Sequence, residues 1–471
     1  MPPSIALWLC VGFVIWLCLQ DSKRRERTSG ALWIPLMWAL IISSRPLSLW
    51  LGVRGGPESG AGGVEDTIID KSVFLFLITA GLIVLVRRHV DWTAIFRNNK
   101  WLFLYFIYLG ASVLWSDEPF VSFKRWIKDA GNIVMILVIL TEQNPFEAVR
   151  TFLARWTYVL LPSSVLIIKY YPQLSRIYDI WTNQPVSVGP STDKNTFGML
   201  LFVCGLSLVW LLLEDRGEKN HKRALLIYSF LLFLTILLLG NAQSATAITC
   251  LLLGSCLLVA ARVPIVRSQA SRFWTFVVAA TVAVAILHGS GAWDAILKEF
   301  ARAVGRDSTL HGRVEIWQNV LKEDINPLIG VGYYSFWSPE RNQRISKGYF
   351  YLLGESHNGY IETYLNSGII GLTLLALMIL SATNRIRRDF HGGSSFAALR
   401  LAFLITIAVY NITESAFDRL VPVWFALLLV LIEYPRPLEN GAEEEEFDFS
   451  LQAPNEVAVE EEVPDHLAPI R

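Results

Sequence analysis

Apolar stretches alternate with short polar segments along most of the chain, and this alternation is its dominant pattern. A helix needs roughly 20 mostly apolar residues to cross the hydrocarbon core of a bilayer. The pattern therefore predicts an all-α polytopic membrane protein with about 12 or 13 transmembrane helices. The candidate spans are 4–20, 31–52, 72–86, 100–115, 129–141, 151–170, 196–213, 224–240, 244–261, 273–288, 363–382, 396–412 and 419–434.

Lysine and arginine cluster on alternate polar segments, and these clusters orient the predicted helices. Positively charged short loops favour the cytoplasmic side of a membrane. The N-terminus is therefore predicted to face outward and, with an odd number of spans, the C-terminus to be cytoplasmic. The clusters lie within 23–27, 87–100, 216–223, 262–272 and 385–388.

Four regions follow from this threading. Residues 1–288 are predicted to form transmembrane helices with short loops, 289–362 one large outer loop, and 363–435 the C-terminal transmembrane helices. Residues 436–471 are rich in glutamate and cannot bury enough apolar surface to fold. We expect an acidic disordered cytoplasmic tail there, with a docking site for a cytoplasmic partner as the alternative.

Part of the large outer loop, residues 311–322, carries apolar side chains at helical spacing. This spacing predicts an amphipathic helix that lies on the membrane surface or on the other helices. The residues that fall near one face of the helix are Val314, Trp317, Val320 and Leu321.

Composition agrees with a membrane protein and excludes several other classes. Of the 471 residues, 53% are hydrophobic and 17% are charged, whereas soluble domains have roughly 25% charged residues. The formal net charge is zero, so a basic nucleic-acid-binding surface is not indicated. The five cysteines lie in apolar stretches without a CxxC or a histidine-spaced pattern, so we expect neither a disulfide nor a zinc site.

The predicted outer side carries many cationic side chains, although outer loops are normally poor in lysine and arginine. Such a group suggests an anionic ligand, and the guanidinium fork suits phosphate or pyrophosphate. Arg45 lies inside an apolar stretch, where it either meets an anion or snorkels at a helix end marked by Pro46. The outer cations include Arg45, Arg125, Arg176, Lys194 and Arg313.

Polar groups at three outer helix ends accompany these cations. Lys194 and Asn195 precede a span, where backbone amides could face an anion or Asp193 or Asn195 could simply cap the helix. Glu414 lies at an outer helix end, where it could be a cap or an ion-pair partner.

The third outer segment carries a histidine at the start of a predicted span. If this segment is helical from His357 onward, His357, Tyr360 and Tyr364 share one face. A lone histidine at an interface is more often structural than catalytic, so the spacing alone leaves both readings open.

Nucleotide-dependent chemistry is not indicated. The sequence has no GxGxxG, Walker, HExxH or DxD-type nucleotide-sugar pattern, and the predicted cytoplasmic loops are too short for an ATP-binding domain. Any chemistry is therefore expected on the outer face, with a leaving group that arrives with the substrate.

Several short motifs, in order, resemble the O-antigen ligase and Wzy-type polysaccharide polymerase family of bacterial inner membranes. The resemblance covers most of the chain, including the long outer loop before the last spans. Residues 44–51 and 305–317 look closest to exopolysaccharide polymerases of the succinoglycan type, although His311 stands where that branch would have threonine. The motifs are WSDEP (115–119), GPSTDKNTFG (189–198), NAQSAT (241–246), GRDSTLHGRVEIW (305–317), NPLIGVGYYSFW (326–337), SHNGYIETYLNSGIIGL (356–372) and NITES (411–415).

This resemblance implies glycosyl transfer between lipid-linked glycans at the periplasmic face of the inner membrane. The donor would be an oligosaccharide on undecaprenyl pyrophosphate, and a hydroxyl of the acceptor glycan would displace the pyrophosphate. Neither a metal nor a cofactor is implied, since side-chain cations could neutralise the pyrophosphate. Besides membrane lipids, the implied partners are a flippase and a chain-length regulator, and no nucleic acid is expected.

The resemblance also implies roles for individual residues. His357 would be the catalytic residue that activates the acceptor, and Glu414 would orient His357 or bind sugar hydroxyls. Arg313 would contact the pyrophosphate or the glycan. The other residues expected to bind substrate are Lys194, Arg176, Arg45, Arg125, Asn195, Asn358 and Tyr360.

Three alternatives remain open at this point. A ligase would move finished glycan onto lipid A-core. A glycan transporter or flippase would be expected to have inverted repeats or interrupted helices with polar residues at mid-membrane, whereas the ionisable residues here concentrate at outer helix ends. A scaffold for a secretion complex would act through the acidic tail.

Overall fold

The computed structural model describes residues 1–24, 28–53, 67–178, 185–215, 221–263, 311–349, 352–392 and 394–434. Most of this part is helical, and its one sheet is a short antiparallel hairpin of β1 (Arg176–Tyr178) and β2 (Pro185–Ser187). The predicted span 273–288 and the predicted tail 436–471 lie outside the described residues.

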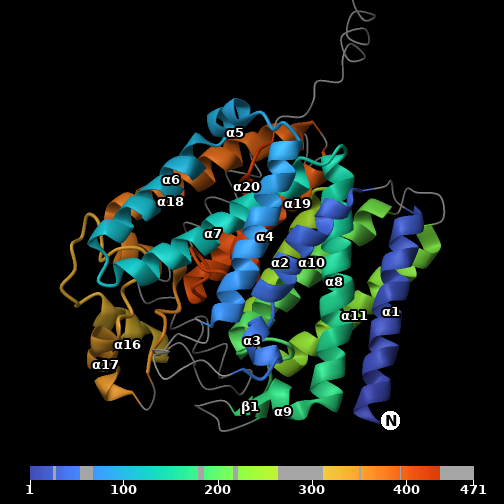
Figure 1. Ribbon diagram of the computed structural model, residues 1–471, viewed down its shortest axis with the longest axis horizontal. Coiled ribbons are helices and arrows are strands. Elements are labelled where there is room, and N and C mark those ends of the chain that lie inside the picture. Colours follow the sequence, from blue (N-terminus) through green and yellow to red (C-terminus); the bar gives the residue numbers. More distant parts are fainter. Residues whose placement is uncertain are drawn as a thin grey trace, which may run out of the picture. The chain divides into compact units, whose positions relative to one another are not determined.

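The helices of the described part belong to one compact unit, Met1–Tyr434 (Figure 1). Three short 3-10 helices are η1 (Gly30–Leu32), η2 (Val113–Trp115) and η4 (Ser346–Gly348). The α-helices are α1 (Pro3–Arg24), α2 (Trp33–Ile42), α3 (Leu47–Trp50), α4 (Ile68–Arg87), α5 (Trp92–Asn98), α6 (Lys100–Ser112), α7 (Pro119–Leu140), α8 (Pro145–Tyr170), α9 (Pro172–Ser175), α10 (Lys194–Glu214), α11 (His221–Ala242), α12 (Ala245–Ala260), α16 (His311–Val320), α17 (Pro339–Ile345), α18 (Gly359–His391), α19 (Ser395–Thr413) and α20 (Pro422–Leu431).

Seven helices of the described part are long and apolar enough to cross a membrane, namely α1, α4, α8, α10, α11, α18 and α19. Shorter apolar helical stretches lie at 30–42, 100–115, 245–260 and 422–431. Together with α7, these helices account for every predicted span inside the described residues. The predicted all-α polytopic membrane architecture is therefore confirmed.

One predicted span, 31–52, is wrong as a single helix. α2 ends at Ile42, and the short α3 starts only after Pro46. Proline lacks a backbone N–H and disfavours helical geometry in the preceding residue, so the helix cannot continue through this point. The hydroxyl groups of Ser43 and Ser44 donate back to the carbonyls of the preceding turn, at 2.5 and 2.8 Å.

The predicted span 129–141 starts too late, because α7 begins ten residues earlier at Pro119. Its first half is polar on the side that faces the protein, which an apolar criterion cannot detect. There, Nη1 of Arg125 donates to the carbonyl of Tyr334 at 2.9 Å, and Asp129 is buried.

Ion pairs join the connections predicted on the cytoplasmic side, so these connections lie at one end of the helices. α5 lies at this end too, at the top of Figure 1. The ion pairs are Arg88–Glu142, Arg150–Asp215, Arg262–Glu214 and Arg400–Glu433.

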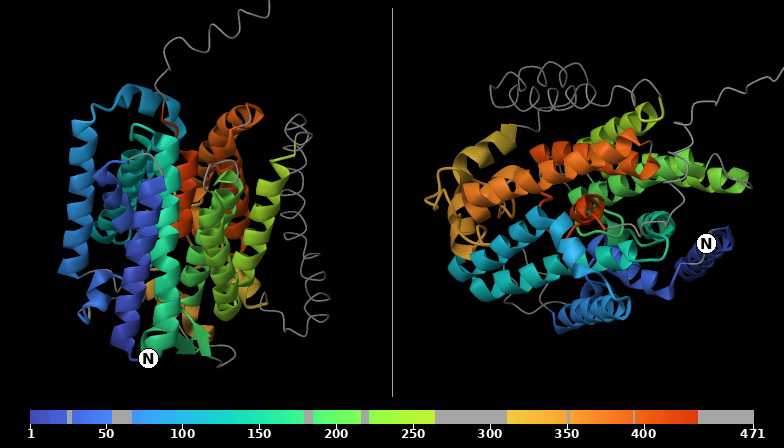
Figure 2. Two further views of the ribbon diagram at one scale, coloured as in Figure 1. Left: turned by 90° about the vertical axis from the view of Figure 1, so that its right-hand side faces the viewer. Right: turned by 90° about the horizontal axis from the view of Figure 1, so that it is seen from above.

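The connections predicted on the outer side lie at the opposite end, which we call the loop end. α3, α9, the β-hairpin, α16 and α17 lie there with the N-terminus, at the bottom of Figure 1. The long helices run between the two ends, as Figure 2 shows from two further sides. The predicted alternation of connections between two sides is therefore present in the fold.

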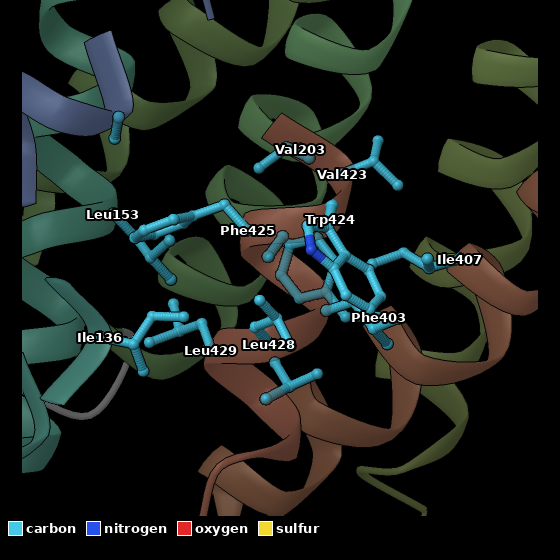
Figure 3. Packing of buried hydrophobic residues seen from close by; sticks show 14 of the residues in the cluster. Ile136, Leu153, Val203, Phe403, Ile407, Val423, Trp424, Phe425, Leu428 and Leu429 are labelled. Carbon is cyan, nitrogen blue, oxygen red and sulfur yellow. The ribbon is translucent and has the colours of Figure 1, made fainter. Parts of the chain in front are cut away.

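α20 lies in the middle of the hydrophobic core although it has only ten residues, all of them buried. A helix that is apolar on every side is suited to full burial rather than to a surface. Figure 3 shows Trp424, Phe425, Leu428 and Leu429 of α20 among residues of α7, α8, α10 and α19, which include Ile136, Leu153, Val203, Phe403 and Ile407.

The predicted amphipathic helix of the outer loop is present as α16, and it packs on other parts of the chain. Ile316 and Val320 are buried in a small cluster with Phe336 and Leu365. Leu321, which was predicted near the same helical face as Val320, is exposed and follows the last residue of α16.

Candidate active site

The start of α18 is attached to the end of α19, which brings two of the sequence motifs together. The backbone N–H of Asn358 donates to Oγ of Ser415 at 2.9 Å, and its side-chain Nδ2 donates to the carbonyl of Ile412 at 3.0 Å. The side-chain oxygen of Asn358 also accepts from the N–H groups of Tyr360 and Ile361, so Asn358 is the N-cap of α18. His357 is thereby fixed beside Glu414.

His357 lies just before α18 and not inside it. Its φ angle of 53° is a left-handed conformation that few residues other than glycine adopt. The prediction that His357, Tyr360 and Tyr364 share a helical face is therefore wrong, because the helix starts only at Gly359.

Two carboxylates face one nitrogen of His357. Nδ1 lies 2.9 Å from Oε1 of Glu355 and 3.5 Å from Oε2 of Glu414. Both contacts are ion-pair distances rather than well-aligned hydrogen bonds. Among the described residues, no hydrogen bond to Nε2 of His357 is present, so this nitrogen is the one that can meet a substrate.

Each of the two carboxylates has its own arginine. Nη2 of Arg313, from α16, donates to Oε1 of Glu414 at 2.7 Å, and Nη1 of Arg313 donates to the carbonyl of Thr413. Nη1 of Arg419 pairs with Oε2 of Glu355. We call Arg313, Glu355, His357, Glu414 and Arg419 the histidine cluster.

The charges of the histidine cluster favour a protonated imidazole. Burial by itself lowers the pKa of His357, but the carboxylates of Glu355 and Glu414 outweigh burial and raise this pKa to about 10. Burial likewise raises the pKa of Glu355, but Arg419 and His357 outweigh it and hold this pKa well below its usual range. Three cations and two anions then leave the cluster with one net positive charge at neutral pH.

An aromatic ring links the histidine cluster to α7. The ring of Tyr334 lies between two guanidinium groups, with its centroid 4.5 Å from Cζ of Arg125 and 5.7 Å from Cζ of Arg419. Both contacts are at cation–π distance. Arg125 therefore reaches the cluster indirectly, through Tyr334.

The loop that carries Tyr334 is packed tightly against the segment before α7. Gly332 has a φ of 100°, and a Cβ atom there would lie 2.5 Å from Cα of Ser116. The N–H of Asp117 donates to Oγ of Ser335 at 3.0 Å, and Asn366 accepts from two N–H groups of the same loop. The loop is thus the motif NPLIGVGYYSFW, and residues of the motifs WSDEP and SHNGYIETYLNSGIIGL hold it in place.

The start of α10 lies near the cluster but not in it. Oδ1 of Asp193 accepts from the N–H of Thr196 at 2.8 Å, so ordinary helix capping takes place there. α10 packs on α12 and α12 on α19, where the hydroxyl groups of Thr246 and Thr413 lie 3.0 Å apart. Lys194 and Asn195, at the start of α10, are half-buried.

The structure does not bring the remaining predicted residues into contact with His357. Arg45 donates from Nε to the carbonyl of Ser191 at 3.1 Å and from Nη2 to that of Leu174. Arg176 is exposed on β1. The hydroxyl of Tyr360 donates to the carbonyl of Ala408 at 2.9 Å, which is a packing role.

Comparisons with known proteins support the motifs quoted above. Residues 228–376 match the Wzy_C family model, described as O-antigen ligase. This matched segment includes Arg313, Glu355 and His357, whereas Glu414 and Arg419 follow it. The family resemblance predicted from the sequence is confirmed.

The chain is also similar to the exopolysaccharide production protein ExoQ of Rhizobium meliloti (strain 1021). The identity is 27% over 306 residues, which cover 62% of this chain and 67% of the relative. Together the two comparisons support a membrane protein of the polysaccharide polymerase and ligase type.

Sequence reasoning missed Glu355, Arg419 and Tyr334. Glu355 is two residues from His357, and Arg419 is five residues after Glu414, so both lay inside or beside quoted motifs. The sequence signal that could have indicated these two residues was the presence of a carboxylate and an arginine at predicted outer helix ends. Their pairing across 64 positions could not be read from spacing.

Proposed function

We propose that this protein joins lipid-linked oligosaccharide repeat units into exopolysaccharide by glycosyl transfer from undecaprenyl pyrophosphate. The observation that carries the proposal is the imidazole of His357, held on Nδ1 by two carboxylates and flanked by Arg313, in a chain that matches the O-antigen ligase family model over residues 228–376. The relative named for exopolysaccharide production favours polymerisation over ligation.

The histidine cluster suits a reaction in which pyrophosphate leaves. The acceptor hydroxyl attacks the anomeric carbon of the donor sugar, and the bond from that carbon to the pyrophosphate oxygen breaks. His357 gives its Nε2 proton to the departing pyrophosphate and takes up the proton of the acceptor hydroxyl, so the imidazole ends as it began. Arg313 and the net positive charge of the cluster stabilise the pyrophosphate as it departs.

Arg313 can serve substrate without giving up its present partners. A guanidinium group has five N–H donors, of which the contacts with Glu414 and Thr413 use two. The exposed or half-buried cations at the same end are proposed to receive the anionic headgroup and the glycan around the cluster. They are Arg45, Arg125, Arg176 and Lys194, with Asn195 beside them.

We place the reaction at the periplasmic face of the bacterial inner membrane. The support is the alternation of lysine- and arginine-rich connections, which the positive-inside rule assigns to the cytoplasm. Arg313 of the histidine cluster belongs to α16, which lies at the loop end, opposite those connections. In this orientation the N-terminus is periplasmic and the C-terminus cytoplasmic, and a flippase would supply the donor while a chain-length regulator would limit the product.

The reaction is proposed to need no metal, although Glu355, His357 and Glu414 could hold an ion by geometry, with ligand atoms within 4.8 Å of one another. Each carboxylate already pairs with an arginine, and the two guanidinium groups would repel a cation. The proton of the imidazolium balances the carboxylates instead. A chelator should therefore leave the transfer rate unchanged.

Reconstitution tests the proposed reaction. The purified protein would be placed in liposomes with lipid-linked repeat units, and the products would be separated by length. A ladder of multiples of one repeat supports the polymerase. Products only on added lipid A-core would establish the ligase instead, and movement of the donor across the bilayer without a new glycosidic bond would establish a transporter.

A further inference from the structure

Glu355 and Arg419 form an ion pair directly behind the imidazole of His357, and neither makes a bond or transfers a proton in the reaction described above. Oε2 of Glu355 faces Nη1 of Arg419, while Oε1 of the same carboxylate lies 2.9 Å from Nδ1 of His357. One carboxylate thus bridges the guanidinium and the imidazole. We propose that Glu355 and Arg419 are positioning residues, which direct Nδ1 of His357 inward and leave Nε2 for the substrate.

Arg419 is itself fixed from three sides, so it can serve as an anchor. Its Nη2 donates to the carbonyl of Gly354 at 3.3 Å, and the ring of Tyr334 lies against its guanidinium. Its neighbour Asp418 has a φ of 58° and accepts a hydrogen bond from the buried Tyr105. The carboxylate of Glu355 therefore meets a guanidinium that has little freedom to move.

The backbone of His357 needs such an anchor. A left-handed φ in a residue other than glycine costs free energy. Such a conformation persists only where the surrounding structure enforces it. The N-cap at Asn358 fixes the chain after His357, and the pair formed by Glu355 and Arg419 fixes the chain before it. The imidazole is thereby held between two fixed points.

The groups that govern protonation of His357 come from several elements. Glu355 precedes α18, Glu414 follows α19, and Arg313 comes from α16. Tyr410 of α19 lies behind Glu414, and the hydroxyl of this buried side chain has no hydrogen-bond partner among the described residues. Arg419 belongs to the cluster itself, and the remaining groups near the cluster are Asp193, Tyr334 and Glu362.

This inference rests on the proposed function, and it gives Glu355 a measurable effect. Removing the charge of Glu355 takes one of two carboxylates away from Nδ1, so His357 loses its proton at a lower pH. Because the protonated imidazole starts the reaction, the alkaline limb of the rate profile should shift to lower pH. A residue that only stabilised the fold would lower the amount of folded protein without moving that limb.

The experiment measures the initial rate of transfer from lipid-linked repeats against pH in proteoliposomes. For Glu355→Gln we expect the alkaline limb to shift down by about one pH unit or more, so that the rate at pH 8 changes little and the rate loss approaches roughly tenfold above the pH of about 10 at which His357 of the wild type loses its proton. Arg344→Gln, at an exposed position of α17 that pairs with Glu323, is the matched control and should keep the wild-type profile. An unshifted limb for Glu355→Gln would overturn the inference.

Arg419→Gln alone leaves Glu355 charged and without its guanidinium, so this variant is expected to fold poorly. The double variant Glu355→Gln/Arg419→Gln removes both charges and avoids that cost. If the two residues act as a unit, the double variant should show the same pH shift as Glu355→Gln alone. The loss of Arg419 then adds little to the loss of Glu355. Additive losses would mean that the two residues act separately, against the inference.

His357→Ala separates the inference from the proposed function. If this variant is inactive while Glu355→Gln keeps the wild-type profile, His357 is catalytic and only the positioning role is wrong. If His357→Ala is fully active, the assignment of His357 in the proposed function fails, and the positioning role fails with it.

Discussion

Arg313 joins the long outer loop to the end of α19 through Glu414. Its Nη2 lies 2.7 Å from Oε1 of Glu414, and its Nη1 donates to the carbonyl of the preceding residue, Thr413. Thr413 and Glu414 follow Arg313 by 100 and 101 positions in the sequence. The second oxygen of Glu414 faces His357 at 3.5 Å, so one carboxylate couples the outer loop to the imidazole.

The first prediction concerns the geometry of Arg313. A lysine would keep the charge but could not reach both Glu414 and Thr413, because its ammonium is a single point. A charged hydrogen bond contributes about 1.5–3 kcal/mol, so Arg313→Lys should lower the transfer rate by roughly ten- to a hundredfold. The rate would be measured in proteoliposomes at matched protein levels. Arg344→Lys should keep the wild-type rate, and an equal loss in both variants would contradict the specific role of Arg313.

The second prediction concerns the kink in α18. Gly368 has a φ of 63° and a ψ of −167°, and a Cβ atom there would lie 2.2 Å from the carbonyl oxygen of Leu328. Gly368→Ala should therefore lower the free energy of unfolding by about 1–3 kcal/mol or more. The measurement is thermal unfolding in detergent, followed by tryptophan fluorescence.

The matched control for the kink is Gly12→Ala in α1. No atom lies within 4 Å of a Cβ atom built at Gly12, and its backbone is helical. That variant should be neutral or stabilise the protein by about 0.5–1 kcal/mol. Equal thermal midpoints for the two variants would show that the kink does not require glycine.

The third prediction concerns stability against pH. The pKa of His357 is raised in the fold to about 10, from an ordinary value near 6.5. The stabilisation from this protonated group is fully present below about pH 6.5 and is lost as the pH rises through about 10. The thermal midpoint should therefore fall across this window, and it should fall less steeply in His357→Ala. Identical slopes for the two proteins would contradict the ion pairs on Nδ1.

Hydropathy predicted most of the fold, because each span is a local property of the chain. The predictions failed where backbone chemistry or protein contacts overruled it. Pro46 ends a helix inside a continuous apolar stretch. The first half of α7 is polar because Arg125 and Asp129 face protein groups rather than lipid.

The candidate site could be predicted only in part, for a similar reason. Motifs in sequence identified His357 and Arg313, and the resemblance linked them to Glu414. The pairing of Glu355 with Arg419 depends on how the start of α18 is attached to the end of α19, and no spacing in the sequence encodes it. Nor does spacing in the sequence show that the hydroxyl of Tyr360 donates to the carbonyl of Ala408.

The most direct test of the central claim is complementation by His357→Ala in a strain that lacks the natural protein. Membrane levels would be matched by immunoblot, polymer would be quantified, and lipid-linked intermediates would be extracted alongside. The account predicts normal protein levels, no polymer and an accumulation of single lipid-linked repeats. Long chains stranded on the lipid carrier would identify a ligase instead. Polymer at the wild-type level would contradict the assignment of His357 and with it the proposed reaction.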